Sequence, residues 1–190
     1  MKEVFLYLSH NLISRSRVGG RAPDIEYKEG YLEKYSFFLT ISHDEIPTVG
    51  DLDISIFVKR GYLVTGDETR FPDIGVDCIL HAPAPSRLDE IGRMMVIRES
   101  GLAEKGVAID PDFYFVKIGG SPNLIQDEDY YEMGLVKSGY SFLFEVNEEG
   151  YPAEVLDGDY PFNYGALYVY GKTDADGRVF DVVAGFTQYS

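Results

Sequence analysis

Short apolar and aromatic stretches, some of them alternating with polar residues, recur along the chain between turn residues, and this pattern predicts β-strands. Strands are expected over 4–9, 36–41, 53–58, 61–68, 77–82, 112–118, 141–146, 166–171 and 178–188. The strand at 61–68 should form a hairpin with the strand before it, because Lys59, Arg60 and Gly61 supply a short turn. The sequence TDADGR (173–178) is typical of the turn of a last hairpin.

The clearest helical pattern covers residues 86–101. Ser86 can cap the first turn, Asp89 follows three residues later, and Gly101 is placed to end the helix. Apolar residues step at three and four positions along one face, namely Leu88, Ile91, Met94 and Met95. A weaker helical pattern covers 24–35, and residues 127–139 are expected to form a short acidic helix or a loop. The predicted fold class is therefore α+β, predominantly antiparallel β with few short helices.

Two loops that lie 100 residues apart resemble each other. Residues 17–25 read RVGGRAPDI and residues 117–126 read KIGGSPNLIQ. We expect the Gly pairs to adopt positive φ angles or to allow the two halves of the chain to pack closely. The alternative is a ligand-binding loop such as a phosphate cradle. That alternative is disfavoured because neither loop has G-x-G-x-x-G spacing and the distance from the Gly pair to the Pro differs by one residue.

The similarity continues further along the chain. Residues 35–47 (YSFFLTISHDEIP) align without a gap on residues 140–152 (YSFLFEVNEEGYP), at an offset of 105. Residues 50–58 (GDLDISIFV) match residues 165–172 (GALYVYGK) at an offset of 115. Three matches in the same order favour a duplication over chance similarity of short aromatic strands.

We predict a single domain over residues 1–190 with internally duplicated halves that share one core. The internal repeat comprises segments 17–58 and 117–171, and the helix-containing connector between them spans 84–111. A length of 190 residues suits one domain of this kind.

No catalytic motif stands out in the sequence. The GKT sequence at 171–173 lacks the upstream Gly of a phosphate-binding loop, because Ala166 occupies that position. Ser141 lacks the second Gly of a G-x-S-x-G turn, because Leu143 occupies it. We therefore predict no catalytic residues and no enzymatic activity.

The sequence also offers no metal-site spacing. Cys78 and His81 are three residues apart on an expected strand, so their side chains should point to opposite faces. His10 and His43 have no ligand partner at a suitable distance in sequence. The D-x-D-G sequence at 174–177 begins like a calcium loop but lacks the closing Glu. We predict no metal and no cofactor.

The net charge of −15 is spread unevenly. Residues 1–100 carry 16 acidic and 12 basic side chains, whereas residues 101–190 carry 16 acidic and 5 basic ones. Such a field disfavours nucleic acid and anionic membranes and favours a basic protein partner. The single Cys78 and the lack of a signal sequence predict a cytoplasmic location.

The second half concentrates acidic residues and tyrosines in a pattern that could dock a basic partner. The predicted partner-binding residues are Asp127, Glu128, Asp129, Tyr130, Tyr131, Glu132, Glu148, Glu149, Asp157, Asp159 and Tyr160. Carboxylates would steer the partner, and tyrosines would bury contact area with little loss of side-chain entropy. The alternative is an acidic face that serves only solubility.

Three sequences in one order carry a resemblance to a known family. They are the Gly-Gly-x-Pro loop at 119–122, the strand YSFLFEV at 140–146 and the strand GALYVYG at 165–171. Over about residues 113–171 the chain resembles the YwqG-like family of bacterial domains of uncertain function, with a weaker echo over 17–58. The resemblance implies a cytoplasmic, mostly β domain. Domains of this kind also occur among the immunity proteins beside bacterial toxin genes.

These observations lead to two hypotheses from different classes. The first is a non-catalytic protein-binding protein, in its specific form an immunity protein that neutralises a cognate bacterial toxin through the acidic, Tyr-rich surface. The second is a small-molecule-binding protein or hydrolase with a cleft between the two repeated halves. The oligomeric state does not follow from the sequence.

If the acidic surface steers a basic partner, binding should weaken steeply as salt is added, because mobile ions screen exposed charges. Charge reversal at Asp127, Glu128, Asp129 and Glu132 should then slow association, measured by stopped-flow at several salt concentrations. A complex whose association rate does not respond to salt or to these substitutions would contradict this surface.

Overall fold

The computed structural model describes residues 2–9, 14–104, 113–126, 128, 130–147, 150, 155–158, 160–162 and 164–189. The strands of this described part are β1 (Val4–Ser9), β2 (Arg17–Val18), β3 (Tyr35–Ile41), β4 (Asp53–Lys59), β5 (Val76–His81), β6 (Ser100–Glu104), β7 (Val116–Ile118), β8 (Ser141–Asn147), β9 (Gly165–Thr173) and β10 (Val179–Tyr189). Its helices are α1 (Tyr31–Lys34), the 3-10 helix η1 (Pro47–Val49) and α2 (Tyr130–Lys137). The predicted α+β class, mostly antiparallel β with few short helices, is confirmed. None of these helices has the length and apolar character needed to cross a membrane.

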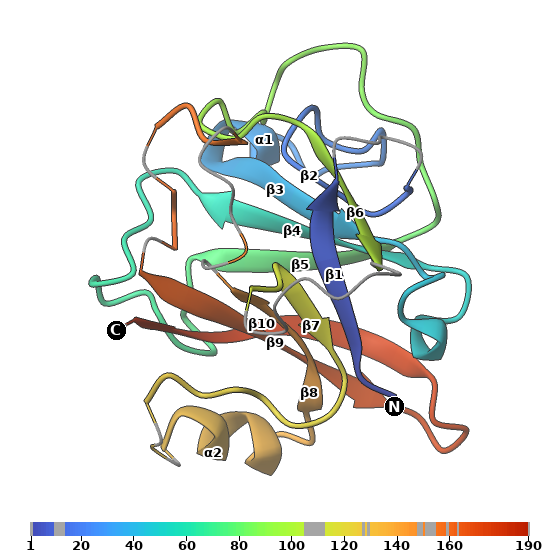
Figure 1. Cartoon of the computed structure of the whole chain (residues 1–190), viewed down its shortest axis with the longest axis vertical. Coiled ribbons are helices and arrows are strands. Elements are labelled where there is room, and N and C mark those ends of the chain that lie inside the picture. Colours follow the sequence, from blue (N-terminus) through green and yellow to red (C-terminus); the bar gives the residue numbers. More distant parts are fainter. Residues whose placement is uncertain are drawn as a thin grey trace.

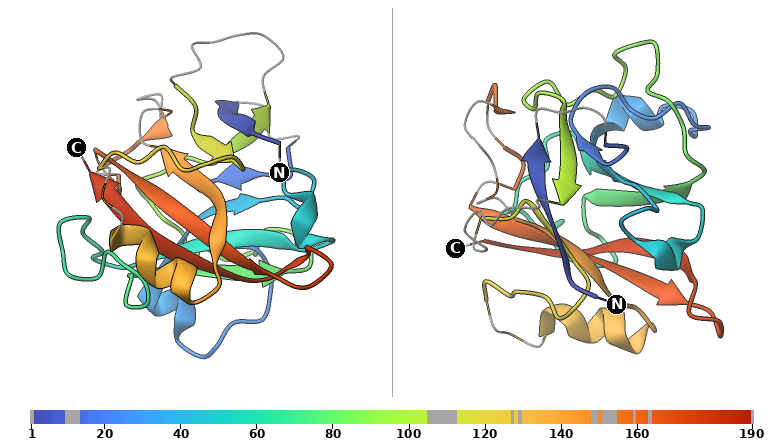
Figure 2. Two further views of the ribbon diagram at one scale, coloured as in Figure 1. Left: turned by 90° about the horizontal axis from the view of Figure 1, so that it is seen from below. Right: turned by 45° about the vertical axis from the view of Figure 1, so that its right-hand side comes forward.

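All ten strands belong to one antiparallel sheet with the order β10-β9-β8-β7-β1-β6-β2-β3-β4-β5. Figures 1 and 2 show β1 and β6 side by side between the two sets of outer strands. The first strand of each half pairs with the second strand of the other half, β1 with β7 and β6 with β2. The sheet curls, so that the Phe71 amide just before β5 donates to the Gly185 carbonyl of β10 at 2.6 Å. The two halves are thus joined at the middle of the sheet and meet again at its ends.

The strands after the two Gly pairs carry the same irregularity. A β-bulge interrupts the pairing of β3 with β4 at Phe38, and another interrupts the pairing of β8 with β9 at Leu143. In the first half, the Gly19 amide donates to the Phe38 carbonyl at 2.7 Å; in the second, the Gly119 amide donates to the Leu143 carbonyl at 2.8 Å. The bulges lie 105 positions apart, the offset that the sequence gives for β3 and β8.

The next pair of strands has a different offset from the one predicted. β3 pairs Phe37 with Phe57, and β8 pairs Phe142 with Tyr170, so equivalent residues of β4 and β9 lie 113 positions apart and not 115. The Gly match misled the alignment because Gly50 ends η1, whereas Gly165 already lies in β9. The duplication itself stays a prediction, which these equivalent registers support.

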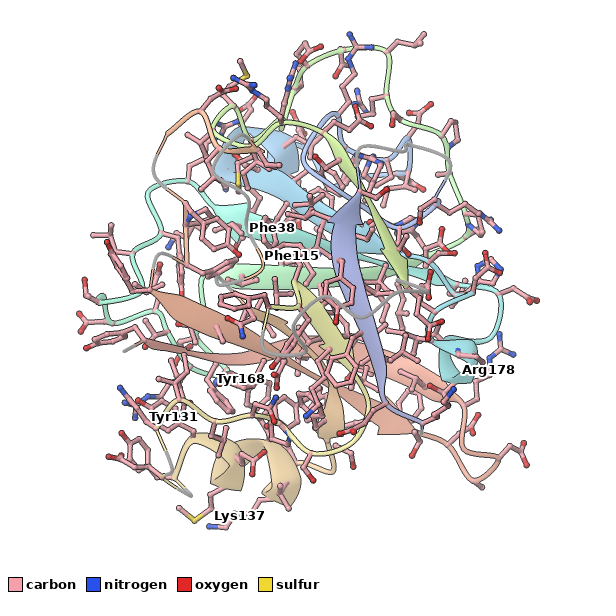
Figure 3. The ribbon with its side chains drawn as sticks, in the orientation of Figure 1. Phe38, Phe115, Tyr131, Lys137, Tyr168 and Arg178 are labelled. Atoms are coloured by element: carbon pink, nitrogen blue, oxygen red, sulfur yellow. The ribbon has the colours of Figure 1, made fainter. Side chains whose placement is uncertain are left out.

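A large apolar cluster fills the interior of the curled sheet and draws on both halves. Phe38 of β3 lies against Phe115, which precedes β7, with ring centroids 6.4 Å apart (Figure 3). Two smaller clusters lie on the outer face, each beneath the connection that carries a helix. One contains Leu32 of α1 with Phe37 and Phe57. The other contains Leu135 of α2 with Tyr168, Tyr170 and Phe186.

The predicted helix at 86–101 is absent, and this prediction was wrong. The segment runs over the top of the molecule as an extended loop (Figure 1). Gly92 has a φ of 78°, and its carbonyl accepts a hydrogen bond from the Phe37 amide at 2.6 Å. The Arg98 amide donates to the Val155 carbonyl at 2.9 Å. Backbone bonds to both halves therefore replace the bonds that a helix would make within itself, and Gly101 lies in β6.

The predicted hairpin at 61–68 is also absent. The Lys59 amide donates to the Gly75 carbonyl at 2.8 Å, so β4 pairs directly with β5 across a long loop. Residues of that loop instead reach β10, where the Thr187 amide donates to the Thr69 carbonyl at 3.0 Å. The helix predicted at 24–35 is reduced to the four residues of α1, preceded by Gly30 in a left-handed conformation. The helix predicted within 127–139 is α2.

The Gly pairs need glycine for two reasons, as predicted, and a matched pair of variants separates them. Gly19 and Gly61 both have positive φ angles, 66° and 78°. A Cβ on Gly19 would lie 2.8 Å from the Arg98 carbonyl oxygen, whereas a Cβ on Gly61 would meet nothing within 4 Å. Gly61→Ala should cost about 1 kcal/mol of unfolding free energy for the left-handed backbone. Gly19→Ala should cost at least about 2 kcal/mol more, because rigid backbone must shift.

Urea unfolding of both variants beside the parent protein measures this difference. Equal losses of stability in the two variants would contradict the close approach of residues 97–98 to Gly19.

Candidate functional site

A row of polar side chains crosses the outer face of the first half. Arg17 of β2, Thr40 of β3 and Ser55 of β4 are direct neighbours across the strands. His81, at the end of β5, lies diagonally next to Ser55. We call these four residues the first polar row. Three antiparallel pairings bring them together from positions that are far apart in sequence.

Hydrogen bonds link three members of the row. Thr40 Oγ1 and Ser55 Oγ are 2.7 Å apart, and Ser55 Oγ and His81 Nε2 are also 2.7 Å apart. His81 Nδ1 lies 2.7 Å from the Ala82 carbonyl oxygen, which can only accept, so Nδ1 carries the proton of the neutral ring. Nε2 then accepts from Ser55, and Ser55 accepts from Thr40. All three side chains are thereby held in place.

The contact between Ser55 and His81 has the geometry of a nucleophile with its base. Yet the Ser55 side chain is 0% exposed and lies within β4, so a substrate has no path to its hydroxyl in this structure. The pair therefore acts in the structure by satisfying buried polar atoms.

Arg17 gives the row a positively charged side chain that hydrogen bonds hold in place. Its guanidinium donates to the Gly19 and Arg21 carbonyls at 2.7 and 2.6 Å and lies 4.5 Å above the Phe37 ring. Glu99 Oε1 is 3.9 Å away. Burial lowers the pKa of Arg17, and the charge of Glu99 works in the opposite direction. A guanidinium nevertheless remains charged in proteins, so Arg17 stays a cation.

A cavity of about 420 Å³, the polar pocket, opens in front of this row. Its polar lining consists of Ser14, Arg15, Arg17, Thr40, Asp53, His81, Ser86 and Glu99. The carboxylate of Asp53 is buried and accepts from the His43 amide at 3.0 Å and from His43 Nδ1 at 2.8 Å. The opposite wall is formed by residues 83–86, which follow β5. The pocket thus presents both hydrogen-bond donors and acceptors.

The second half has a polar row at the equivalent places. Lys117 of β7, Glu145 of β8 and Tyr168 of β9 are neighbours across the strands, and Gln188 of β10 takes the place of His81. Even the flanking carboxylate has a counterpart, because Glu3 Oε1 lies 3.5 Å from Lys117 Nζ. We call Lys117, Glu145, Tyr168 and Gln188 the second polar row.

The second row is not open, because residues 123–126 of the chain lie on it as a covering segment. The Asn123 amide donates to Glu145 Oε2 at 2.7 Å, and the Tyr168 hydroxyl donates to the Asn123 carbonyl at 2.7 Å. The carboxamide of Gln188 accepts from the Gln126 amide at 3.1 Å and donates to the Gln126 carbonyl at 2.8 Å. The Ile125 amide also donates to the Tyr168 hydroxyl at 3.3 Å, so five hydrogen bonds between the row and the backbone hold this stretch of polypeptide.

The side chain of Asn123 also forms hydrogen bonds. Its Oδ1 accepts from Lys117 Nζ at 3.1 Å, and its Nδ2 donates to the Tyr114 hydroxyl at 2.7 Å. Tyr114 in turn donates to Glu145. Burial raises the pKa of Glu145, against the lowering effect of the hydrogen bonds from Tyr114 and Asn123.

Two local differences explain why the first row stays open. The loop after Gly20 has one residue more before its Pro, and the Asp24 amide donates to the Pro85 carbonyl at 2.7 Å. The segment therefore pairs with residues 85–87 and leaves the polar pocket beside Arg17, Thr40 and His81, while Ser55 stays buried. In addition, Thr40 and Ser55 are smaller than Glu145 and Tyr168, which stand at the equivalent places.

A second cavity, of about 620 Å³, lies where the two halves meet. Residues 58–65 of the first half, residues 160–161 of the second and residues 93–96 of the connector line it. We call it the seam cavity. A cleft between the halves is what the small-molecule hypothesis expects.

The predicted partner-binding residues on α2 are partly committed to contacts within the protein. Tyr130 and Tyr131 stack on each other at 4.5 Å, and the Arg70 guanidinium lies 4.6 and 4.4 Å from their ring centroids. Glu132 accepts a hydrogen bond from the Tyr170 hydroxyl. Glu128 is exposed.

The other described members lie elsewhere. Asp157 forms an ion pair with Arg98, and Tyr160 is buried against Phe38 and Phe162. Figure 1 shows α2 at the bottom and the segment around 155–162 at the upper left, so the six described residues do not form one surface. The remaining predicted residues, Asp127, Asp129, Glu148, Glu149 and Asp159, lie outside the described residues.

The sequence did not reveal the first polar row as a site. Its members come from four strands, and only the register brings them together. The spacing of Cys78 and His81 did predict their faces, because Cys78 packs against the main core and His81 lines the polar pocket. Within the described part of the chain, no group of three His, Cys, Asp or Glu side chains is placed to hold a metal ion.

The chain matches no family model, no curated protein and no solved structure. The resemblance to the YwqG-like family stays a prediction.

The hydrogen-bond chain through Ser55 predicts a stability effect. Ser55→Ala would leave the buried hydroxyl of Thr40 and the Nε2 atom of His81 without this partner. The expected loss is about 1–3 kcal/mol of unfolding free energy. Ser141→Ala, on an exposed Ser of β8, should stay within about 0.5 kcal/mol of the parent protein. Thermal and urea unfolding measure both, and a neutral Ser55→Ala would contradict the network.

Proposed function

We propose that the protein is a non-catalytic binding protein that takes up an extended segment of a partner polypeptide in the polar pocket. One observation carries this proposal: the second polar row holds a stretch of the protein's own backbone, while the equivalent first row borders a cavity.

The chemistry of the pocket suits a polypeptide. A backbone needs acceptors for its N–H groups and donors for its carbonyls. Asp53, Glu99 and the Thr40 oxygen supply acceptors, and Arg15 and Arg17 supply donors. Its volume lies within the range of roughly 300–1,000 Å³ that is typical of ligand sites.

An immunity protein that neutralises a bacterial toxin is the specific form of this hypothesis. A net charge of −15 would speed the encounter with a basic toxin domain, and the polar pocket would then hold one of its loops or termini. We place this binding in the cytoplasm. The single Cys78 is a free thiol, and its burial raises the thiol pKa, which suits a reducing compartment.

Selection from a random heptapeptide library displayed on phage tests the proposal. The parent protein should enrich peptides that bind it in solution, measured by isothermal titration calorimetry. Ser55→Tyr places in the first row the residue type that the second row has at Tyr168, and it should weaken these peptides at least about tenfold by filling the pocket. Ser141→Tyr makes the same chemical change on exposed β8 and should leave their affinity unchanged.

A second variant guards against a failure of Ser55→Tyr to fold. Glu99→Gln alters an acceptor at the pocket rim without entering the core, and it should weaken the same peptides severalfold. The proposal is wrong if no peptide is enriched over background, or if the enriched peptides bind both pocket variants as well as the parent protein.

A further inference from the structure

The seam cavity is a separate site, because it shares no lining residue with the polar pocket. The connector that forms one wall is bonded to both halves. The Phe37 amide donates to the Gly92 carbonyl at 2.6 Å, and the Asp157 amide donates to the Val96 carbonyl at 2.8 Å. The cavity therefore has walls from the first half, the connector and the second half, all fixed by backbone bonds.

Apolar and aromatic side chains form much of its lining. Met94 and Tyr160 are buried beside it, and Tyr62 is anchored by a bond of 2.7 Å between its hydroxyl and Thr187 Oγ1. Burial raises the pKa of Tyr62 to about 12, so the phenol is neutral. Two long apolar side chains stand at the opening, Leu63 with 66% and Met95 with 68% of its surface exposed. Apolar surface of this kind gains free energy when a ligand covers it.

The charges that line the cavity are all positive. Lys59, Arg60 and Arg93 belong to the lining, and no Asp or Glu does among the described residues. This local group of positive charges contrasts with the net charge of −15 of the whole chain. Lys59 is paired with Glu68 and Arg93 with Glu90, at their outer sides.

Arg60 differs from these two cations. Its side chain is exposed and, within the described part of the chain, forms no ion pair. Its backbone is nevertheless fixed, because the Arg60 amide donates to the Lys34 carbonyl at 2.8 Å. Arg60 thus presents, from a fixed backbone position at the edge of the cavity, a guanidinium that can reach an anion.

The place that corresponds to the seam cavity when the two halves are exchanged shows a different character. There a cavity of about 390 Å³ is lined by Pro47, Thr48, Gly50, Asp51, Asp176, Gly177 and Arg178. The Arg178 guanidinium lies directly over Gly50, 2.5–2.7 Å from the place that a Cβ would occupy (Figure 3). The carboxylates of Asp51 and Asp176 line the same cavity as this cation. The turn between β9 and β10 takes the place that the long loop between β4 and β5 has in the seam cavity. The apolar, cationic seam cavity is therefore no general consequence of the fold.

We infer that the seam cavity binds an organic anion with an apolar body, which lies against Tyr62 and Met94 while its acidic group pairs with Arg60. Charge complementarity selects the anion, and the volume of about 620 Å³ admits a molecule of the size of a medium-chain fatty acid or a bicyclic aromatic acid. This site is independent of the peptide binding proposed for the polar pocket.

Fluorescence titration with 8-anilinonaphthalene-1-sulfonate tests the inference, because this probe is an aromatic anion and the protein contains no Trp. We expect saturable binding with one site per chain, and displacement of the probe by octanoate. Octan-1-ol, which has a similar apolar body without the charge, should displace it at least about tenfold less effectively.

Two variants locate the probe. Arg60→Gln should weaken binding of the probe about tenfold by removing the paired cation. Lys137→Gln removes an exposed cation at the end of α2, which Figure 3 shows at the bottom of the molecule and which contributes no described residue to the cavity lining, and should leave binding unchanged. Since Arg60 is exposed, its replacement leaves the core intact. The inference is overturned by an absence of saturable binding, by equal displacement with octanoate and octan-1-ol, or by an Arg60→Gln variant that binds like the parent protein.

Discussion

The pairing of β1 with β6 is the interaction on which the rest of the architecture depends. It pairs Leu6 with Glu104 and Leu8 with Leu102, so an approximate twofold axis between the two antiparallel strands relates one to the other. Because β1 also pairs with β7, and β6 with β2, neither half can complete its sheet alone. The main apolar core forms inside the resulting curled sheet, and the two polar rows fall on its outer face at matching positions.

The two polar rows have equivalent backbones but different side chains, so one row is covered by the chain itself and the other borders a cavity. In the second half, Glu145, Tyr168 and Gln188 reach far enough to bond the backbone of the covering segment. In the first half, the smaller Thr40 and Ser55 bond mainly to each other and to His81, and the space in front stays open. The covered row therefore indicates what kind of ligand the open row can hold, and its backbone contacts indicate a polypeptide.

The sequence predicted the features that depend on local pattern. The apolar, aromatic sequences of β3 and β8 predicted these two strands to within a residue, and the positive φ of the Gly pairs followed from the absence of a Cβ. The predictions from the sequence failed where contacts between distant parts of the chain determine the structure. The helical spacing of residues 86–101 was overridden by backbone bonds to both halves, and the short β6 exists only because β1 and β2 lie on either side of it. The polar pocket depends on the register of four strands, which no local pattern contains.

The central claim is that the second polar row is filled by the chain's own backbone, and amide hydrogen exchange followed by NMR tests it most directly. The amides of Asn123, Ile125 and Gln126 donate to side chains of the row, whereas the described structure gives the amide of Glu26, in the equivalent connection of the first half, no acceptor. The account predicts that these three amides exchange slowly, like the amides of the neighbouring strands, while that of Glu26 exchanges rapidly. Rapid exchange of all three at the rate of Glu26 would contradict the account, because the covering segment would then not be seated on the row.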